Sequence, residues 1–419
     1  MSDAMDSIVD PALARVGQQR IEWAKAHMPA LAAATAVASS ALDGRRVGVI
    51  LTLEPKTACL ALALKATGAR VSVYSSAPYV SDDIAAALAA DGVDVFARSD
   101  ADRAADMVLL NRFIDTGVEY LIDDGAGATR YIHTHRRDAL EHLKGVAEET
   151  TSGVRPLRVM AADGALKVPA LAVNDASSKQ LFDNVYGTGA SVITTLLDVT
   201  NTQMQGKSMV VLGYGYVGRG IAGYARALGA RVTVTEIDPI RALQALHDGH
   251  DVARLEEMCP TADVFITATG IGYSLTGDHM RLMKDGAIVS VGGAGPPEVD
   301  LGGSAPLQAG GLARKAIREI PLDDGRSVFL IADGECSNVS AGEGNPIEIM
   351  DLSFAVQLRS VDYLAQNAHD LEPGVHPVPE MIDKAVALSL LRAQGADVDT
   401  PTEQQRAHAE SWDLADGEI

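Results

Sequence analysis

Short runs rich in Val, Ile and Leu alternate along the chain with longer stretches in which apolar residues recur every three or four positions. Runs of the first kind are typical of buried parallel strands, and those of the second kind of helices that cover a sheet. Up to residue 125 this alternation predicts a doubly wound α/β unit. Its helices are expected at 11–42, 57–69, 81–92 and 102–115, and its strands at 45–53, 70–76, 93–97 and 118–124. The period in the first helix predicts five buried positions: Ile21, Trp23, Ala24, Met28 and Leu31.

A second unit of the same kind follows a helix at 190–201, with strands expected at 210–212, 232–234, 263–270, 286–293 and 327–334. Between the units, residues 148–188 are polar and irregular, so a hinge and a cleft are expected there. A loop at 337–346 leads to a helix at 348–366 that is expected to return to the first unit.

The pattern therefore predicts an α/β protein with two doubly wound, Rossmann-like domains, a hinge and a C-terminal extension. Residues 1–183 are expected to form a substrate-binding and catalytic domain, to which 340–395 return. Residues 184–339 are expected to form a nucleotide-binding domain, and 396–419 a polar, acidic tail whose last residues are disordered.

Composition narrows the class of protein. The 419 residues contain no apolar run near the roughly 20 residues that span a bilayer. A net charge of −21 opposes binding to nucleic acid or to an anionic membrane. Cys59, Cys259 and Cys336 lie far apart without CxxC spacing, so neither a disulfide framework nor a metal site is expected. These features favour a soluble cytoplasmic enzyme.

Residues 210–239 follow the order strand, glycine turn, helix, strand, acid. In a dinucleotide-binding unit, Gly213 allows the tight turn, Gly215 lets the backbone approach a pyrophosphate, and Gly218 lets the helix pack on the strand. Glu236 ends the second strand, where a carboxylate accepts the ribose hydroxyls of NAD and repels the extra phosphate of NADP. The helix N-terminus faces the phosphates and adds two candidates, Tyr216 and Val217. The motif predicts bound NAD.

Polar residues follow two strands of the first unit, where a ligand crevice forms in such sheets. They are Thr52, Glu54 and Lys56 after one strand, and Asp123 and Asp124 after another.

Several long motifs resemble the S-adenosylhomocysteine hydrolase family. They are IDDGAG (122–127), YIHT (131–134), AEETTSGV (147–154), LKVPALAVNDASSKQLFDNVYGT (166–188), GYGYVGRG (213–220), TATG (267–270), EVD (298–300) and PGVHPVP (373–379). The resemblance runs from about residue 10 to about 395.

The resemblance implies a tightly bound, recycled NAD that oxidises the 3′-hydroxyl of a nucleoside. The ketone acidifies the C4′ hydrogen, the 5′ substituent leaves by elimination, water adds, and the ketone is reduced again. By position, Lys179 and Asp183 match the pair at the 3′-hydroxyl, and a lysine can take that proton if the site lowers its pKa. Asp124 matches the carboxylate near C4′, and Glu149 matches a ribose-binding acid. The matching cofactor contacts are Thr150, Thr151, Ser152, Asn184, Thr269 and Asn338.

Plainer interpretations stay open for several of these residues. Lys179 and Asp183 have the i, i+4 spacing of an exposed helix salt bridge. Asp123 and Asp124 have the composition of a turn before Gly125. His133 and His135 lack a third ligand in register and are expected to be packing or surface residues.

The departures from the family pattern fall at the 5′ side and at the base. Thr52 and Ala294 stand where the family has its two active-site histidines, and Thr188 where it has a cysteine. Lys56 replaces a base-reading Glu or Gln, and Asn345 replaces a histidine. The family's C-terminal arm, which reaches the NAD of a neighbouring subunit, is replaced by SWDLADGEI.

Three functions are compatible with this pattern. The first is an NAD-dependent nucleoside dehydratase or lyase, in which Thr52, Glu54, Lys56, Asn345 and Glu149 bind the substrate. The second is a true S-adenosylhomocysteine hydrolase, and the third a non-catalytic NAD-binding regulator. A small-molecule nucleoside substrate and a homo-oligomer, a dimer or a tetramer, are expected.

Overall fold

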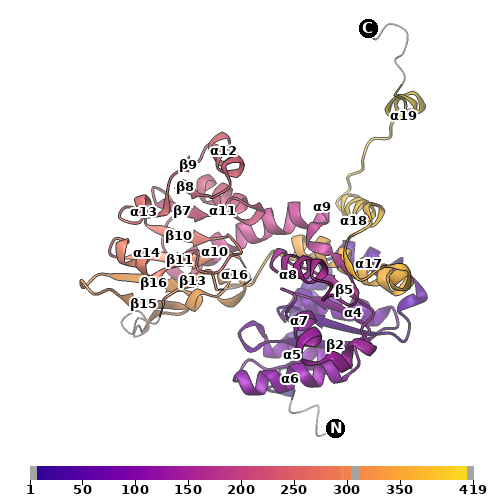
Figure 1. Ribbon diagram of the computed structural model, residues 1–419. Coiled ribbons are helices and arrows are strands. Elements are labelled where there is room, and N and C mark those ends of the chain that lie inside the picture. The colour runs from indigo at the N-terminus through magenta and orange to yellow at the C-terminus, as the bar shows by residue number, and fades with distance from the viewer. Residues whose placement is uncertain (1–6, 294, 296, 303–310, 413–419) are drawn as a thin grey trace.

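The computed structural model describes residues 7–293, 295, 297–302 and 311–412. They form two α/β lobes that lie side by side (Figure 1). One lobe contains the N-terminal part of the chain together with α17 and α18, and the other contains the elements from α10 to α16. The expected class, an α/β protein with two Rossmann-like units, is confirmed.

The first sheet has seven strands in the order β17-β6-β5-β4-β1-β2-β3, and all neighbours are parallel. Its central strands are short and buried on both faces, as parallel strands covered by helices must be. The strands are β1 (Arg46–Ile50), β2 (Arg70–Ser75), β3 (Asp94–Ala97), β4 (Tyr120–Asp123), β5 (Gly145–Glu148), β6 (Pro169–Ala172) and β17 (Gly374–Pro377).

Nine helices of eight residues or more accompany this sheet in the part of the chain that the structure describes. They are α2 (Ala14–Ala26), α3 (Pro29–Ala36), α4 (Pro55–Ala66), α5 (Asp82–Ala90), α6 (Arg103–Asp115), α7 (Gly127–His135), α8 (Thr151–Ala162), α17 (Ile347–Asn367) and α18 (Glu380–Ala393). Four of the five positions expected to be buried are buried: Ile21, Ala24, Met28 and Leu31. The prediction is wrong for Trp23, which is 65% exposed and packs on His27. Two residues along a helix turn the side chain by about 200°, so Trp23 points away from the face that buries Ile21.

The expectation that residues 148–188 are irregular is wrong. This segment contains α8 and β6, followed by α9 (Ser177–Lys179) and a π-helical stretch, η6 (Gln180–Thr188). Gly153 and Pro156 obscure α8 in the sequence, but Val154 and Leu157 bury its apolar face, and packing outweighs propensity. A Cβ on Gly153 would lie 2.1 Å from Glu148 Oε1, so the glycine is required by close packing.

The second sheet has eight strands in the order β14-β15-β16-β12-β10-β7-β8-β9. The strands from β16 to β9 are parallel, and β14 and β15 add an antiparallel edge. The strands are β7 (Ser208–Leu212), β8 (Arg231–Thr235), β9 (Asp251–Val252), β10 (Val264–Thr267), β12 (Ala287–Val291), β14 (Leu312–Arg314), β15 (Ile317–Pro321) and β16 (Ser327–Ile331). Its helices are α10 (Gly189–Thr200), α11 (Tyr216–Ala227), α12 (Pro239–His247), α13 (Leu255–Met258), α14 (Gly277–Leu282) and α16 (Ser337–Ser340), and β11 (Leu275–Thr276) pairs with β13 (Val299–Asp300).

The chain passes between the lobes twice, through α9, η6 and α10, and again through the loop between α16 and α17. Helix α17 packs on α3, α4 and β5, elements of the first lobe. The boundaries at 183/184 and 339/340 stay predictions. Helix α19 (Glu403–Glu410) extends away from both lobes (Figure 1). The end of the tail, where disorder is expected, lies outside the described residues.

Candidate active site

The carboxyl ends of β4, β5 and β6 meet at one edge of the first sheet. Asp124 follows β4, Glu149 follows β5, and Lys179 ends the short α9 beyond β6. Because neighbouring parallel strands end at the same edge, these residues, far apart in the sequence, come together there.

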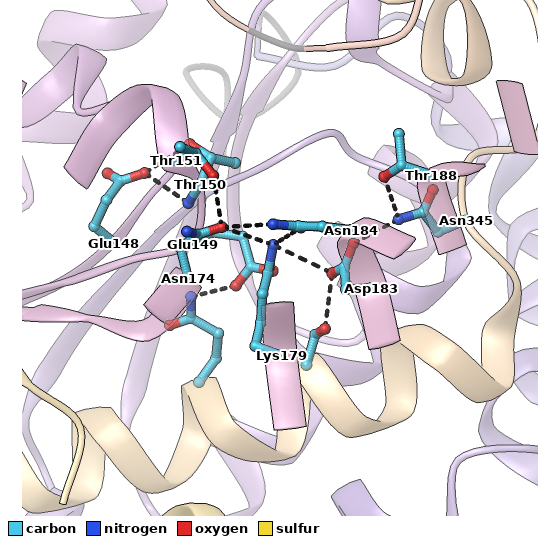
Figure 2. Close-up of polar contacts among 12 residues, drawn as sticks. Glu148, Glu149, Thr150, Thr151, Asn174, Lys179, Asp183, Asn184, Thr188 and Asn345 are labelled. Atoms are coloured by element: carbon cyan, nitrogen blue, oxygen red, sulfur yellow. Dashed lines mark hydrogen bonds and ion pairs between the residues drawn. The ribbon is translucent and has the colours of Figure 1, made fainter. Parts of the chain in front are cut away.

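The ammonium of Lys179 lies at the centre of the cluster (Figure 2). Its Nζ is 3.5 Å from Asp183 Oδ2 and 3.7 Å from Glu149 Oε1. It donates a hydrogen bond of 2.9 Å to Asn184 Oδ1. Lys179 is 3% and Asp183 4% exposed, so the pair is not the exposed helix salt bridge that its spacing also allows.

The carboxylate of Asp183 has a partner on each oxygen. Asn345 Nδ2 donates to Oδ1 and Ser353 Oγ to Oδ2, both at 2.7 Å. Ser353 comes from α17, the helix that returns from the other lobe. The orientation of Asp183 therefore depends on the second passage of the chain between the lobes.

Burial and charge set the ionisation of these groups. Burial raises the pKa of Glu149 to about 8, although the Lys179 ammonium counteracts it. Burial also raises the pKa of Asp124. Burial by itself lowers the pKa of Lys179, but the carboxylates of Asp183, Glu149 and Asp124 outweigh it, and the net pKa is raised. The condition under which Lys179 could take the 3′-hydroxyl proton, a lowered pKa, is not met in this structure, because three carboxyl groups surround the ammonium.

Glu148 fixes the loops that carry Asp124 and Thr150. Its carboxylate accepts hydrogen bonds from the N–H groups of Gly125, Ala126 and Thr150 at 2.9 to 3.0 Å. The predicted cofactor contacts Thr150, Thr151 and Ser152 lie at the start of α8, directly beyond this support.

Sequence reasoning missed four residues of the site: Glu148, Asn174, Ser353 and Gln357. Asn174 Oδ1 accepts from Asn184 Nδ2 at 3.1 Å and lies 3.5 Å from Lys179 Nζ. Gln357 Nε2 donates to Glu149 Oε2. A signal was present, since buried polar residues interrupt the apolar α17 and Asn174 follows a strand end.

The glycine turn after β7 fits a dinucleotide. Gly213 has φ +91°, and a Cβ there would lie 2.9 Å from Ala268 O. A Cβ on Gly218 would lie 2.0 Å from Gly213 O, so α11 starts directly against the turn. Gly215 has only Arg241 Nη1 nearby, at 3.9 Å, so its Cα faces open space. Tyr216 and Val217 open α11, whose first N–H groups lack acceptors within the helix.

Glu236 lies beside this turn, after β8. Its Oε2 accepts from Tyr214 N at 2.7 Å, and its Oε1 from Ile237 N and Asp238 N at 2.7 and 3.0 Å. The backbone thus holds a carboxylate at the position expected for the NAD ribose, and the residues present fit NAD.

The remaining cofactor candidates are held by hydrogen bonds to other polar groups. Thr269 donates to Glu298 Oε2 through N–H and hydroxyl, at 2.9 and 2.7 Å. Asn338 is 3% exposed and donates to Ser191 Oγ and Asn345 Oδ1, each at 3.0 Å.

The loop after β1 carries the residues that depart from the family pattern. Glu54 caps α4 and pairs with Lys56 at 2.8 Å, and Lys56 Nζ also donates to Glu343 O at 2.9 Å. Burial raises the pKa of Glu54, although Lys56 counteracts it. Thr52 O accepts from Thr57 Oγ1 at 2.6 Å, which tightens the same loop. Ala294, at the second histidine position, lies outside the described residues.

Other candidates play structural roles. The ring of His133 contacts Thr129 O through Nδ1 and accepts from Lys167 N through Nε2, so it serves packing. The three cysteines are buried thiols. Within residues 7–412, as far as the structure describes them, no helix has the length and apolarity to cross a bilayer.

Comparisons with known proteins agree with this geometry. The family model described as S-adenosyl-L-homocysteine hydrolase matches residues 6–141, and that of its NAD binding domain matches residues 184–344. A Methanopyrus kandleri protein named S-inosyl-L-homocysteine hydrolase is 41% identical over 412 residues, which are 97% of each chain. Adenosylhomocysteinase from Pyrococcus abyssi is 41% identical over 411 residues, also 97% of each chain. Adenosylhomocysteinase from Thermotoga maritima is 41% identical over 400 residues, 94% of this chain and 99% of its own. This chain is an NAD-dependent enzyme that belongs to the S-adenosyl-L-homocysteine hydrolase family.

Proposed function

We propose that the enzyme acts on a purine nucleoside with a 5′ leaving group, by transient 3′ oxidation, loss of the C4′ proton and 4′,5′-elimination. The observation that carries this proposal is the buried cluster of Lys179, Asp183 and Glu149 beside Asp124. These are the groups that 3′ oxidation and C4′ deprotonation require. NAD, when bound, supplies the oxidation at C3′ and its reversal.

The charges of the cluster suggest how its protons move. Lys179 stays an ammonium and is placed to orient the 3′ oxygen and to stabilise negative charge on it. Glu149 suits the role of base for the 3′-hydroxyl proton, because a pKa of about 8 lies near the working pH and its Oε1 has no hydrogen-bond donor.

Asp124 suits the second proton transfer. A ketone at C3′ acidifies the C4′ hydrogen, and the Asp124 carboxylate accepts that proton. The bond from C5′ to the leaving group then breaks, its electron pair departs with the leaving group, and a C4′–C5′ double bond forms. The departing group takes up one proton, and the C3′ ketone is reduced to the alcohol.

The 5′ side supports elimination over overall hydrolysis. A threonine hydroxyl does not titrate near neutrality, so Thr52 cannot replace an imidazole as acid or base. General acid–base groups contribute about 10²- to 10⁴-fold each, and their loss should slow water addition.

Overall hydrolysis of an S-nucleosyl homocysteine is the second candidate. It is favoured by the 41% identity, over 97% of the chain, to proteins named for that activity. A reaction in deuterated water separates the two. Elimination predicts that the recovered substrate carries deuterium at C4′ and that little hydrolysed nucleoside is formed. Rapid release of both homocysteine and the hydrolysed nucleoside would refute elimination.

We propose further that the base is a 6-oxo purine. An ammonium donates only, so Lys56 can serve a purine O6 but not an amino group. A relative named for S-inosyl-L-homocysteine accords with this proposal. Inosine should bind more tightly than adenosine, and Lys56→Met should remove the preference. Equal affinities in the unmodified enzyme would exclude Lys56 from base recognition.

A further inference from the structure

The second passage between the lobes carries a side chain with an unusually complete set of hydrogen bonds. Asn345 lies in the loop between α16 and α17, and its amide has two donors and two acceptor sites. Nδ2 donates to Asp183 Oδ1 at 2.7 Å and to Thr188 Oγ1 at 3.2 Å. Oδ1 accepts from Ser191 Oγ at 2.9 Å and from Asn338 Nδ2 at 3.0 Å. All four positions are used.

The orientation of this amide is determined by its neighbours. Rotating it by 180° would place Nδ2 against Asn338 Nδ2 and Oδ1 against the Asp183 carboxylate, and both contacts would be repulsive. A histidine has only two ring nitrogens and could not make the same four bonds. The arrangement therefore depends on asparagine itself.

The partners of Asn345 belong to different parts of the site. Asp183 faces the Lys179 ammonium, whereas Asn338 and Ser191 belong to α16 and α10 in the other lobe. Thr188 ends η6, the first passage between the lobes. Figure 2 shows Asn345 between Thr188 and Asp183, with Lys179 beyond the carboxylate. Asn345 thus contacts both passages between the lobes and the Asp183 carboxylate beside Lys179.

The backbone nearby is built to admit this amide. A Cβ on Gly187 would lie 2.8 Å from Asn345 Nδ2 and 3.0 Å from Ile349 Cγ2. Gly187 is helical and has no need of a positive φ, so the close approach of Asn345 and Ile349 is the reason that accounts for the glycine.

We propose that Asn345 is a positioning residue that holds Asp183 against Lys179 and ties that carboxylate to Asn338 on the cofactor side. The oxidation step and NAD affinity therefore depend on one amide. The interpretation of the oxidation step rests on the proposed function, and the dependence of NAD affinity rests on the cofactor contact that the family resemblance implies for Asn338.

Asn345→Ala tests the proposal against Ser353→Ala, which removes the other hydrogen bond to Asp183 and leaves Thr188, Ser191 and Asn338 untouched. The measurements are the rate and KM of nucleoside-dependent reduction of bound NAD, and the NAD dissociation constant by titration. Asn345→Ala should slow reduction about 10- to 100-fold with KM within about 2-fold, and weaken NAD about 10-fold. Ser353→Ala should slow reduction but leave NAD affinity unchanged. Equal NAD affinities in the two variants would overturn the link to the cofactor side.

Three further variants guard against a general effect on folding. Gly187→Ala should displace the amide and reproduce both losses of Asn345→Ala. Asn345→Asp removes the amide donor and places a second carboxylate against Asp183, so it should slow reduction at least as much as Asn345→Ala. Asn367→Asp adds the same charge at the far end of α17, about 30 Å away, and should not slow reduction. Reduction at the unmodified rate in Asn345→Asp would refute the contact with Asp183. If the unmodified enzyme reduces no NAD with any nucleoside, the proposed function fails, and the NAD titrations still decide the role of Asn345.

Discussion

Replacing Lys179 by Met tests whether a buried ammonium holds the carboxylates of the site together. The Nζ atom lies 3.5 Å from Asp183 Oδ2, and a charge pair at that distance is worth about 5 kcal/mol at an effective dielectric constant of about 20. Part of this is offset by the cost of burying the ammonium. Removing one partner of a buried pair destabilises a protein by about 3–5 kcal/mol, which is the loss expected at pH 7.

The loss of stability in Lys179→Met should grow with pH because of Glu149. Its pKa is raised to about 8 in the folded enzyme, so at pH 7 it is mostly neutral and contributes little to the pair with Lys179. A raised carboxyl pKa contributes stability that is full at low pH and is lost as pH rises through 8. Without the ammonium, Glu149 must keep its proton at still higher pH. The extra penalty is then limited to about 1.4 kcal/mol for each pH unit above 8.

The assay is urea unfolding followed by circular dichroism at pH 7 and pH 9, at a fixed excess of NAD, together with nucleoside-dependent NAD reduction. The rate of NAD reduction in Lys179→Met should fall by at least about 10²-fold. In a Glu149→Gln background, Lys179→Met should lower the free energy of unfolding by the same amount at both pH values. A loss below about 1 kcal/mol at pH 7, or a pH effect that persists in the Glu149→Gln background, would refute the reasoning.

Three further predictions concern NAD binding and the proposed catalytic base, Glu149. Glu236→Gln should weaken the binding of NAD and reduce the enzyme's preference for NAD over NADP, since the variant lacks the charge that repels a 2′-phosphate. Titrations with the two cofactors measure both effects. Gly218→Ala places a Cβ 2.0 Å from Gly213 O and should abolish NAD binding and cost about 1–3 kcal/mol of stability in urea unfolding. The control is Gly223→Ala on the same helix, whose added Cβ would meet no atom within 4 Å. This variant should still bind NAD, and its free energy of unfolding should rise by up to about 1 kcal/mol. In the unmodified enzyme the rate of NAD reduction should rise with pH around 8, because Glu149 acts as base when ionised; Glu149→Gln should remove that rise, and a rise that remains would exclude Glu149.

The class of fold and the cofactor-binding unit could be predicted from local patterns in the sequence. Alternating strand and helix patterns are local properties, so the parallel strands and the order from Gly213 to Glu236 could be predicted residue by residue. Long motifs likewise located Lys179, Asp183 and Glu149 before any geometry was known. Where local signals conflicted with packing, prediction failed: Gly153 and Pro156 hid α8, and Trp23 lay on the exposed face of α2.

The charge of the site and the orientation of its side chains depend on contacts between distant parts of the chain. The raised pKa of Lys179 follows from carboxylates contributed by the loop after β4, the loop after β5 and η6. Their combined electrostatic effect on the ammonium cannot be predicted from any one segment of the sequence. Asn345 lies on the second passage between the lobes, and Ser353 and Gln357 lie beyond it, 162 to 208 positions along the chain from the groups that they bind. Hydrogen bonds across such separations depend on how α17 and the loop before it pack on the first lobe, and such packing is a property of the whole chain and not of any segment.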